Sequence, residues 1–377
     1  MSPRVLILGA GFGGLEVATV LSEEFGEDIE ITLIDSSDTF VFGFAKLDVL
    51  FGKKEPEAVK FPYADVAKPG VRYVRETIAS IDPERLEVTT DAGRHSADHL
   101  VIALGADYDF DATPGLAEVD SEFYSVAGAE RLAKVLPEFE GGRALVGVCG
   151  APFKCPPAPS ECALMLHDYL VERGIRDQSS ISVAIPFETP VPPSPGTSEA
   201  LLEAFAERDI DYVGGSPVVS LDPDRRVAVN GAGRELPFDL FLGVPKHRAP
   251  DVVIETGLTV DGYISVKPSD LKTSAANVWA VGDVTTVGVP KAGVFSEGAG
   301  RVAARSIAAE IRGEPAPGPY DGLGSCYIEF GFGNVARVDV DFLSGPKPTG
   351  TFQAPSETLA AEKAEFGSTR ASRWFGR

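Results

Sequence analysis

The sequence predicts an α/β fold made of two tandem Rossmann-like dinucleotide-binding domains, with the second inserted in the first, followed by a C-terminal α+β segment. Three observations predict this fold. The chain opens with a strand, a glycine-rich turn, a helix and a second strand. A hairpin pattern that begins at Ser80 recurs at Ser220, which indicates two copies of one unit. A strand motif near residue 280 then returns to the first copy.

The opening motif, "VLILGAGFGG", places Gly9, Gly11 and Gly14 at the spacing of a dinucleotide-binding turn. Each glycine removes a side chain where the turn is tight, where a pyrophosphate approaches, or where the helix meets a strand. The helix that follows offers free N–H groups to a phosphate. Asp35 ends the next strand, where it is expected to accept hydrogen bonds from a ribose hydroxyl. This motif predicts a dinucleotide site but does not choose between FAD and NAD.

The repeat predicts where the second phosphate loop should lie. Asp82-Pro83 in the first copy corresponds to Asp222-Pro223 in the second, and the second loop then falls at "CGAPFK", near residues 149–154. Pro152 has no N–H to donate, and the side chains of Phe153 and Lys154 block a close approach to the backbone. We therefore expect that the second domain has lost NAD(P)H binding, with a nonstandard nicotinamide site as the alternative.

Two later strand ends favour FAD in the first domain. "DHLVIALGAD" ends in a turn at Gly105, and "NVWAVGDVTT" ends in Gly282 and Asp283. Both resemble the outlying motifs of flavoprotein disulfide-reductase-like enzymes, and this resemblance implies that Asp283 binds the ribityl chain of FAD. A Gly-Asp pair in isolation is also typical of an ordinary turn at a strand end.

Three of the four cysteines, Cys149, Cys155 and Cys162, lie within one short stretch, and Cys326 lies far downstream. Their spacing does not match the usual zinc-binding pairs, so we expect no metal site. Cys155 precedes a predicted helix, whose dipole, together with the charge of Lys154, is expected to favour its thiolate. We interpret Cys149 and Cys162 as buried packing residues.

The segments "APFKCPPAPSE", "VPKAGVFSEGAGRVAA", "GSCYIEFG" and "EFGSTRASRWFGR" make the chain similar to sulfide:quinone oxidoreductases and to the flavoprotein subunit of flavocytochrome c sulfide dehydrogenase. The resemblance implies a redox-active disulfide between Cys155 and Cys326 beside the flavin. It also places Lys291 near the flavin pyrimidine. Lys46 is a weaker candidate for an FAD contact, with a solvated loop lysine as the alternative.

The resemblance implies FAD-dependent oxidation of sulfide, with electrons passed to a quinone. No cysteine occurs between Asp38 and Phe51, where the flavocytochrome subunit attaches its cofactor, so FAD is expected to be noncovalent. Three alternatives stay open. They are a soluble flavoprotein subunit that passes electrons to a cytochrome c, an NADH:quinone oxidoreductase, and a flavoprotein redox sensor without turnover.

Composition limits the partners and the location. The formal net charge of −22 argues against binding to nucleic acid. No leader-like segment precedes the first strand, and we expect a cytoplasmic protein. The tail "FGSTRASRWFGR" carries arginines and aromatic residues that suit either a peripheral contact with the inner face of a membrane or packing on the protein or a partner subunit. The sequence leaves a homo-oligomer open.

We divide the chain into four predicted segments. Residues 1–110 form the first part of the FAD-binding domain, and residues 111–245 form the second Rossmann-like domain with Cys155. Residues 246–315 return to the FAD-binding domain. Residues 316–377 form the C-terminal segment, with Cys326 and the tail.

Overall fold

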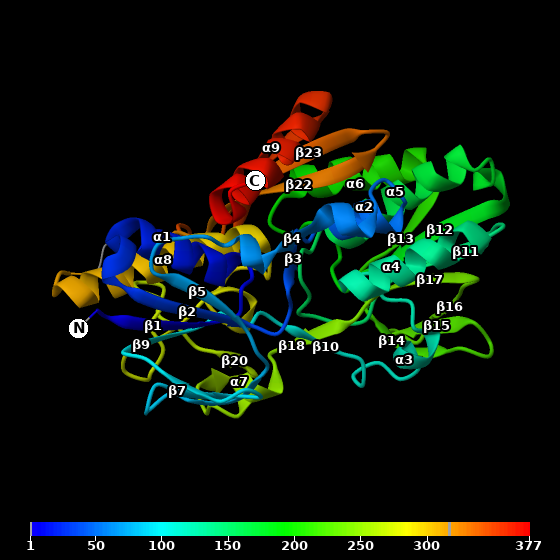
Figure 1. Ribbon diagram of the computed structural model, residues 1–377. Coiled ribbons are helices and arrows are strands. Elements are labelled where there is room, and N and C mark those ends of the chain that lie inside the picture. Colours follow the sequence, from blue (N-terminus) through cyan, green and yellow to red (C-terminus); the bar gives the residue numbers. More distant parts are fainter. Residues whose placement is uncertain (1, 316–317) are drawn as a thin grey trace.

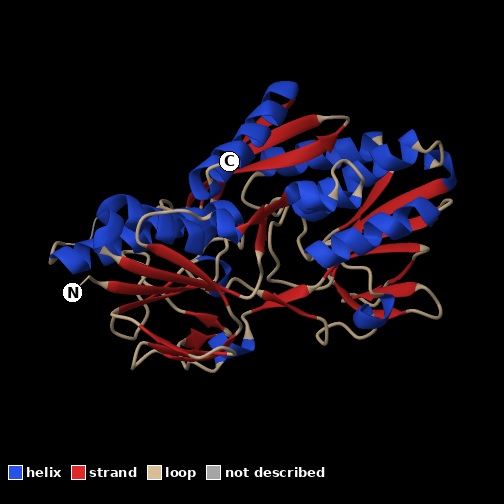
Figure 2. Cartoon of the chain, viewed as in Figure 1, coloured by secondary structure: helices blue, strands red, loops and turns tan. Residues whose placement is uncertain are grey.

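The computed structural model describes residues 2–315 and 318–377. Two parallel sheets lie side by side, and a smaller antiparallel sheet with a long helix lies across one side of both (Figures 1 and 2). This arrangement confirms the predicted α/β class. The predicted C-terminal segment begins at residue 316, which lies outside the described residues.

The first sheet has the strand order β21-β9-β1-β2-β5 and is entirely parallel. Its strands are β1 (Arg4–Leu8), β2 (Glu30–Asp35), β5 (Val71–Arg75), β9 (His99–Ile102) and β21 (Val278–Ala280). Helices α1 (Phe12–Phe25) and α8 (Gly293–Arg312) pack against each other beside it. They approach closely because Gly13 and Gly300 meet at the crossing, where a Cβ on Gly300 would lie 2.8 Å from the Gly13 carbonyl oxygen. The edge strand β21 follows the second domain in sequence but joins the sheet of the first domain, so the second domain is inserted in the first.

The second sheet, with the order β13-β12-β11-β17, is also parallel. Its strands are β11 (Gly142–Val148), β12 (Ser179–Ala184), β13 (Ile210–Val213) and β17 (Leu240–Val244), and its helices are α4 (Val126–Val135), α5 (Ala158–Glu172) and α6 (Pro195–Glu207). The chain enters this domain through β10 (Asp107–Asp109) and leaves through β18 (Lys246–Arg248). These two strands pair antiparallel, so they form the connection between the domains.

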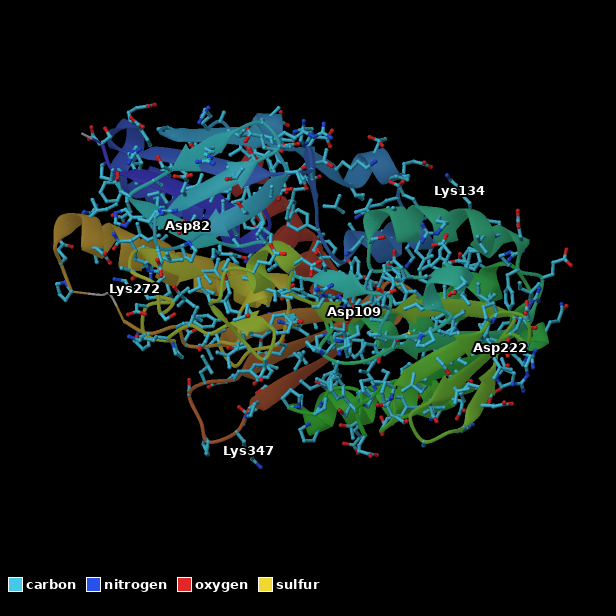
Figure 3. The ribbon with its side chains drawn as sticks, turned by 90° about the horizontal axis from the view of Figure 1, so that it is seen from below. Asp82, Asp109, Lys134, Asp222, Lys272 and Lys347 are labelled. Atoms are coloured by element: carbon cyan, nitrogen blue, oxygen red, sulfur yellow. The ribbon has the colours of Figure 1, made fainter. Side chains whose placement is uncertain are left out.

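The repeated hairpins are confirmed in detail. The first consists of β6 (Ile78–Asp82), β7 (Glu87–Thr90) and β8 (Arg94–Ser96), and the second of β14 (Val218–Asp222), β15 (Val227–Asn230) and β16 (Glu235–Pro237). The Arg85 N–H donates to Asp82, and the Arg225 N–H donates to Asp222, each at 3.0 Å. Figure 3 shows the two aspartates in separate parts of the molecule. Equivalent turns in equivalent places are what a duplicated unit predicts.

The C-terminal sheet contains β22 (Leu323–Gly331), β23 (Asn334–Asp341) and β24 (Thr349–Ser356), and helix α9 (Glu357–Phe375) follows without interruption. The Leu359 N–H donates to the Ser356 hydroxyl at 3.2 Å, so Ser356 caps helix α9. The remaining short elements are β3 (Thr39–Val41), α2 (Ala45–Leu50), β4 (Lys60–Pro62), α3 (Leu116–Val119), α7 (Asp251–Ile254), β19 (Thr259–Val260) and β20 (Tyr263–Ile264).

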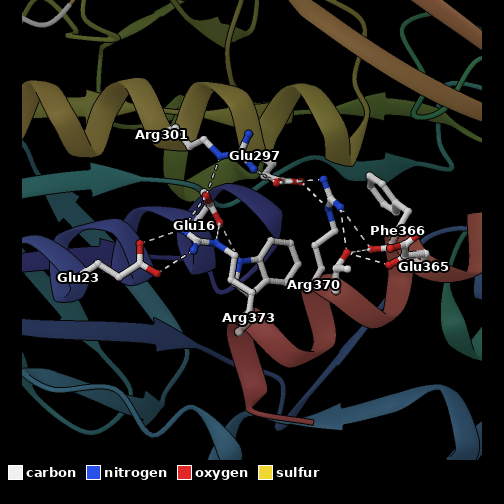
Figure 4. A network of polar contacts seen from close by, with 10 residues as sticks. Glu16, Glu23, Glu297, Arg301, Glu365, Phe366, Arg370 and Arg373 are labelled. Atoms are coloured by element: carbon white, nitrogen blue, oxygen red, sulfur yellow. Dashed lines mark hydrogen bonds and ion pairs between the residues drawn. The ribbon is translucent and has the colours of Figure 1, made fainter. Parts of the chain in front are cut away.

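Helix α9 ends on the first domain, at the buried carboxylate of Glu16 in α1 (Figure 4). The Trp374 indole N–H donates to Glu16 at 2.9 Å, Arg373 donates at 3.2 Å, and Arg301 of α8 donates at 2.8 Å. Burial alone would raise the pKa of Glu16, but these hydrogen bonds hold it below its usual value. One carboxylate therefore joins α1, α8 and α9.

These contacts bear on the two interpretations of the tail. The Trp374 side chain is 1% exposed, Phe375 is buried, and Arg370 donates to Glu297 of α8 at 2.9 Å. Residues that suited a membrane interface are engaged inside the chain, because buried carboxylates and an aromatic cluster supply their partners. The contacts favour packing on the protein. In the part of the chain that the structure describes, no helix is long and apolar enough to cross a membrane.

Replacing Glu16 by glutamine is expected to lower the free energy of unfolding by about 2 kcal/mol, because two guanidinium groups lose a buried ionic partner that they share. The effect is modest for a buried pair since the arginine side chains are 42% and 34% exposed. Because its pKa is lowered, Glu16 stabilises the fold at neutral pH, and this contribution is lost as the pH falls through the lowered value. Urea denaturation measures the change. Glu23→Gln, at the exposed partner of Arg373, is the control and should cost under about 1 kcal/mol.

Candidate active site

Three glycines shape the turn between β1 and α1, and each has a different reason to lack a side chain. A Cβ on Gly14 would lie 1.9 Å from the Gly9 carbonyl oxygen, and a Cβ on Gly9 would lie 2.4 Å from the Ala103 carbonyl oxygen. Packing of the fold therefore requires both. A Cβ on Gly11 would meet no atom within 4 Å, so Gly11 instead faces open space. That space is where a bound phosphate group would approach the backbone.

Gly11 opens into a cavity of about 520 Å³, here called the glycine-loop cavity, which extends from Gly11 and Phe12 to Asp283 and Cys326. Its volume is typical of a cofactor site. The structure brings seven of the predicted site residues to its wall: Gly11, Lys46, Gly105, Cys155, Gly282, Asp283 and Cys326. Gly9, Gly14, Asp35 and Lys291 are not among its lining residues.

Asp35 contacts backbone N–H groups at the end of β2. Its carboxylate accepts the Ala10 N–H at 2.8 Å and the Ser37 N–H at 2.9 Å, which joins β2 to the glycine turn. Burial raises the pKa of Asp35. The predicted ribose contact stays a prediction for this residue, and its structural role in the turn is the one that the hydrogen bonds show.

Asp283 lies in the short turn that follows β21, and it lines the glycine-loop cavity. Burial raises its pKa, and Lys154, Lys291 and Lys46 oppose that effect by their charge. Among the described residues, its buried Oδ1 atom has no hydrogen-bond partner. A buried acceptor without a partner is costly, since desolvation is not offset by a hydrogen bond. A hydroxyl-bearing ligand in the cavity would supply the missing donor.

Three lysines lie near Asp283, of which Lys291 is buried and Lys46 and Lys154 are half-buried. Lys46 donates to the Tyr124 carbonyl, Lys154 donates to the Ala106 carbonyl at 3.1 Å, and Lys291 donates to the Asp283 carbonyl. Burial lowers the pKa of Lys46 and of Lys291 to about 8, and it also lowers the pKa of Lys154. Lys46 and Lys154 line the glycine-loop cavity, and their positive charges favour an anionic group there.

Two expectations about these lysines need correction. Lys46 is not a solvated loop residue, because it lies in α2 and donates into the protein. Lys154 does not stabilise the Cys155 thiolate, since its ammonium group lies 4.6 Å from the centre of the Tyr108 ring and donates to Ala106. The side chain of Lys154 instead lines the glycine-loop cavity, a position that adjacency in sequence to Cys155 did not reveal.

Cys155 lies in the loop between β11 and α5, in a left-handed conformation with φ of 49°. Its N–H donates to the Lys291 carbonyl at 2.7 Å, which ties this loop to the segment before α8. Helix α5 begins only at Ala158. Burial raises the pKa of Cys155, so the expectation of a thiolate favoured by the helix dipole is wrong for the described chain.

Cys326 lies in β22, opposite Val338 of β23, and burial raises the pKa of its thiol to about 12. The charge of one cysteine raises the pKa of the other, which places the two sulfurs in the same region. Each of the four cysteines carries a free thiol in the described chain. Cys149 and Cys162 are buried, at 5% and 0% exposed, which confirms them as packing residues.

A second cavity of about 710 Å³, here called the proline-rich chamber, lies against the same two cysteines. Pro152, Pro156 and Pro192 line it together with Lys291. Cys155 and Cys326 belong to the walls of both cavities, so the pair lies between the glycine-loop cavity and the chamber. A reagent in the chamber could therefore reach the sulfurs while a cofactor fills the other cavity.

The loop at the position of the second phosphate loop, which was expected to have lost nucleotide binding, contains a packed aromatic ring. Phe153 is 3% exposed, and its ring stacks on Phe187 with a centroid distance of 5.7 Å. A side chain therefore occupies space that a glycine loop would leave open, and Pro152 offers no N–H. This packing supports the expected loss of a nicotinamide site in the second domain.

Glu161 is a site residue to which sequence reasoning assigned no role. It is 3% exposed in the first turn of α5 and lines the glycine-loop cavity. Burial raises its pKa to about 7, and its charge raises the pKa of both Cys155 and Cys326. An acidic residue in the first turn of a helix is usually explained by its favourable interaction with the helix dipole. That explanation gives no sign that packing against β22 buries Glu161.

The chain matches proteins of known activity along most of its length. The model of the pyridine nucleotide-disulphide oxidoreductase family matches residues 3–300. Sulfide-quinone reductase of Aquifex aeolicus (strain VF5) is 30% identical over 342 residues, or 84% of this chain and 78% of that protein. The mitochondrial sulfide:quinone oxidoreductase of Mus musculus is 26% identical over 374 residues, or 94% of this chain and 82% of that protein.

A solved structure confirms the fold. The sulfide:quinone oxidoreductase from the hyperthermophilic bacterium Aquifex aeolicus superposes with a TM-score of 0.85 and 24% identity, covering 97% of this chain and 90% of that one. The predicted pair of Rossmann-type domains is therefore correct. Among the described residues, no three His, Cys, Asp or Glu side chains are grouped so that they could hold a metal ion.

Proposed function

The chain belongs to the pyridine nucleotide-disulphide oxidoreductase family and, within it, to the sulfide:quinone oxidoreductases, and we propose that it oxidises sulfide through Cys155 and Cys326 and passes the electrons to a quinone. The observation that carries this proposal is the position of the two cysteines between the glycine-loop cavity and the proline-rich chamber. The relatives supply the donor and the acceptor, and the cavities supply a reason why sulfur chemistry and flavin chemistry would meet there.

Members of this branch are flavoenzymes, and we propose that the cofactor is noncovalently bound FAD. Gly11 and Gly105 each face open space on the cavity wall, and Asp283 offers a buried acceptor that needs a hydroxyl donor. These features fit the pyrophosphate and the ribityl chain of FAD. When bound, FAD supplies a two-electron acceptor that can be reoxidised by a quinone.

Lys291 and the start of α8 would bear on the charge of that cofactor. Lys291 lies in the segment before α8, and Gly293, the first residue of this long helix, lines the glycine-loop cavity. The helix N-terminus and the ammonium group both favour negative charge close by. We propose that they stabilise the reduced, anionic form of the cofactor.

The proposed chemistry begins with a disulfide between Cys155 and Cys326. Hydrosulfide enters the chamber and attacks one sulfur, which forms a persulfide and breaks the disulfide bond, so that the other cysteine leaves as a thiolate. When the disulfide forms again from the persulfide and the thiolate, zero-valent sulfur and one proton are released. The two electrons that this step sets free would pass to bound FAD. The overall change is hydrosulfide plus quinone plus one proton to zero-valent sulfur plus quinol, in which sulfide is oxidised and quinone reduced.

The alternatives differ in what reduces the flavin and what reoxidises it. Packing of Phe153 against Phe187 argues against NADH as the donor. Anaerobic addition of sulfide to the FAD-loaded protein should bleach the flavin, and NADH should not. Reoxidation by a short-chain quinone would support the proposal. Reoxidation by cytochrome c alone would show that the acceptor is a cytochrome and not a quinone. A flavin that neither donor reduces would support the redox-sensor alternative.

A peripheral membrane contact stays in this proposal, through a surface other than Arg370, Arg373 and Trp374.

Burial of both thiols creates a need for a proton donor, and Glu161 is placed to be one. A thiolate that leaves in this environment is unfavourable, because burial raises the pKa of both Cys155 and Cys326. Glu161 has a pKa raised by burial to about 7, which suits proton exchange at neutral pH. Lys363 lies 3.9 Å from its carboxylate and opposes the rise. We propose that Glu161 donates a proton to the departing sulfur.

Glu161→Gln is expected to slow sulfide-dependent flavin reduction about a hundredfold at pH 6, because the amide cannot donate that proton. Above about pH 7 the wild-type carboxyl is ionised, so the ratio of wild-type to variant rates should fall about tenfold between pH 6 and pH 8. The ratio cancels the titration of sulfide itself. Stopped-flow absorbance measures both rates. Glu172→Gln, at the exposed end of the same helix, should keep the wild-type profile, and a ratio independent of pH would contradict the role of Glu161.

A further inference from the structure

Helix α5 and strand β22 carry the two halves of the reactive pair, since α5 follows the Cys155 loop and β22 contains Cys326. They pack against each other through buried carboxylates of α5. Glu161 accepts the Glu329 N–H at 3.0 Å, and Asp168 accepts the Phe332 N–H. Seven residues separate the two carboxylates in sequence, which is about two helical turns, so both face the strand.

Asp168 contacts the backbone of the chain at Gly331 and Phe332, where β22 ends. Asp168 is 4% exposed, and a Cβ on Gly331 would lie 2.7 Å from its Oδ2 atom. Gly331 has φ of +85°, so the chain turns sharply at this carboxylate at the end of β22. The buried carboxylate of Asp168 accepts the N–H that directly follows Gly331, so this contact attaches the end of the strand to α5.

The position of β22 along the axis of α5 affects the distance between Cys326 and Cys155. A disulfide needs Cα atoms about 4.4–6.8 Å apart, while a slip of one residue moves a strand by about 3.3 Å and turns its side chains to the other face. Two carboxylate contacts in one direction along β22, from three residues beyond Cys326 onward, hold the strand against such a slip.

We propose that Asp168 is a positioning residue, which holds β22 so that Cys326 stays within disulfide-bonding reach of Cys155. This inference rests on the proposed function, in which the two sulfurs form a disulfide. Asp168 lines neither the glycine-loop cavity nor the proline-rich chamber, so it acts through the strand and not by contact with the reacting atoms. Glu161 shares the attachment, but its proposed proton transfer makes it unsuitable as the test.

The test measures formation of the Cys155–Cys326 disulfide in the reduced, FAD-loaded protein after addition of diamide. Diamide takes two electrons and two protons from the thiol pair and becomes a hydrazine, and peptide mass spectrometry follows the new bond. Asp168→Ala should slow its formation about tenfold, because small misplacement of reacting groups is costly. Asp168→Asn should slow it about threefold, since an amide oxygen still accepts the N–H, though more weakly. Flavin reduction by dithionite, which bypasses the cysteines, should not change.

Asp239→Asn is the matched control. Asp239 accepts the Arg143 N–H at 2.9 Å in the same domain, away from the cysteines, so its replacement should leave the rate of disulfide formation unchanged. Wild-type rates in both Asp168 variants would overturn the positioning role. If Asp168→Ala does not fold, the rate of Asp168→Asn decides in the same way. Absence of the disulfide in the wild-type protein would instead overturn the proposed function.

Discussion

Cys326→Ser is expected to slow sulfide-dependent reduction of the bound flavin about a thousandfold or more, because a serine hydroxyl can neither form the disulfide nor leave as a thiolate. Cys155→Ser should have the same effect, since the two sulfurs act as one unit. Anaerobic stopped-flow absorbance of the FAD-loaded variants measures the rate. Dithionite should still reduce the flavin in both.

The control for this experiment is a buried cysteine with no proposed role in the reaction. Cys162 is fully buried in α5, so Cys162→Ala tests whether removal of a thiol in the same helix is enough to disturb the site. It should reduce its flavin with sulfide at close to the wild-type rate. A Cys326→Ser variant that bleaches at the wild-type rate would contradict the role of the disulfide.

Gly11→Val is expected to yield a folded protein without FAD. The Gly11 backbone has φ of −76°, which valine can adopt, and its Cβ position is free of contacts, so the fold has room for the side chain. That side chain would project into the glycine-loop cavity, where the pyrophosphate is expected. Flavin absorbance per protein should fall more than about tenfold, while circular dichroism stays unchanged.

Gly14→Ala is the informative contrast, because even this smaller added side chain should act on the fold and not on the ligand. Its Cβ would lie 1.9 Å from the Gly9 carbonyl oxygen, so the turn must shift and the protein should lose its folded structure or solubility. Full FAD content in Gly11→Val would show that the cofactor does not approach this turn, and would remove the cavity from the proposed site.

Features set by local sequence could be predicted closely. The glycine turn and the repeated hairpins depend on residues near each other in the chain, and the structure confirms them. The hairpin turns form because a carboxylate accepts the N–H of the residue three positions later, as Asp82 does from Arg85. Patterns of this kind are readable without knowledge of the rest of the molecule.

Features set by distant packing could not be predicted. The tail could not be assigned because the partner of Trp374 is Glu16, at the opposite end of the chain. Cys155 looked activated in sequence because a lysine precedes it and a helix follows it closely, yet burial raises the pKa of its thiol. Such burial is a tertiary property, and the burial of Glu161, the proposed proton donor, is hidden in sequence for the same reason.

Electrons are proposed to enter this protein through sulfur held between two cavities, and one measurement tests that claim most directly. The FAD-loaded protein, with its disulfide formed, receives one equivalent of sulfide without oxygen, is alkylated at once, and is digested for mass spectrometry. We predict one additional sulfur atom on the peptide of Cys155 or of Cys326 at the earliest time, before the flavin bleaches, and its loss as the disulfide forms again and the flavin bleaches. Bleaching that no added sulfur on either cysteine precedes would contradict the account.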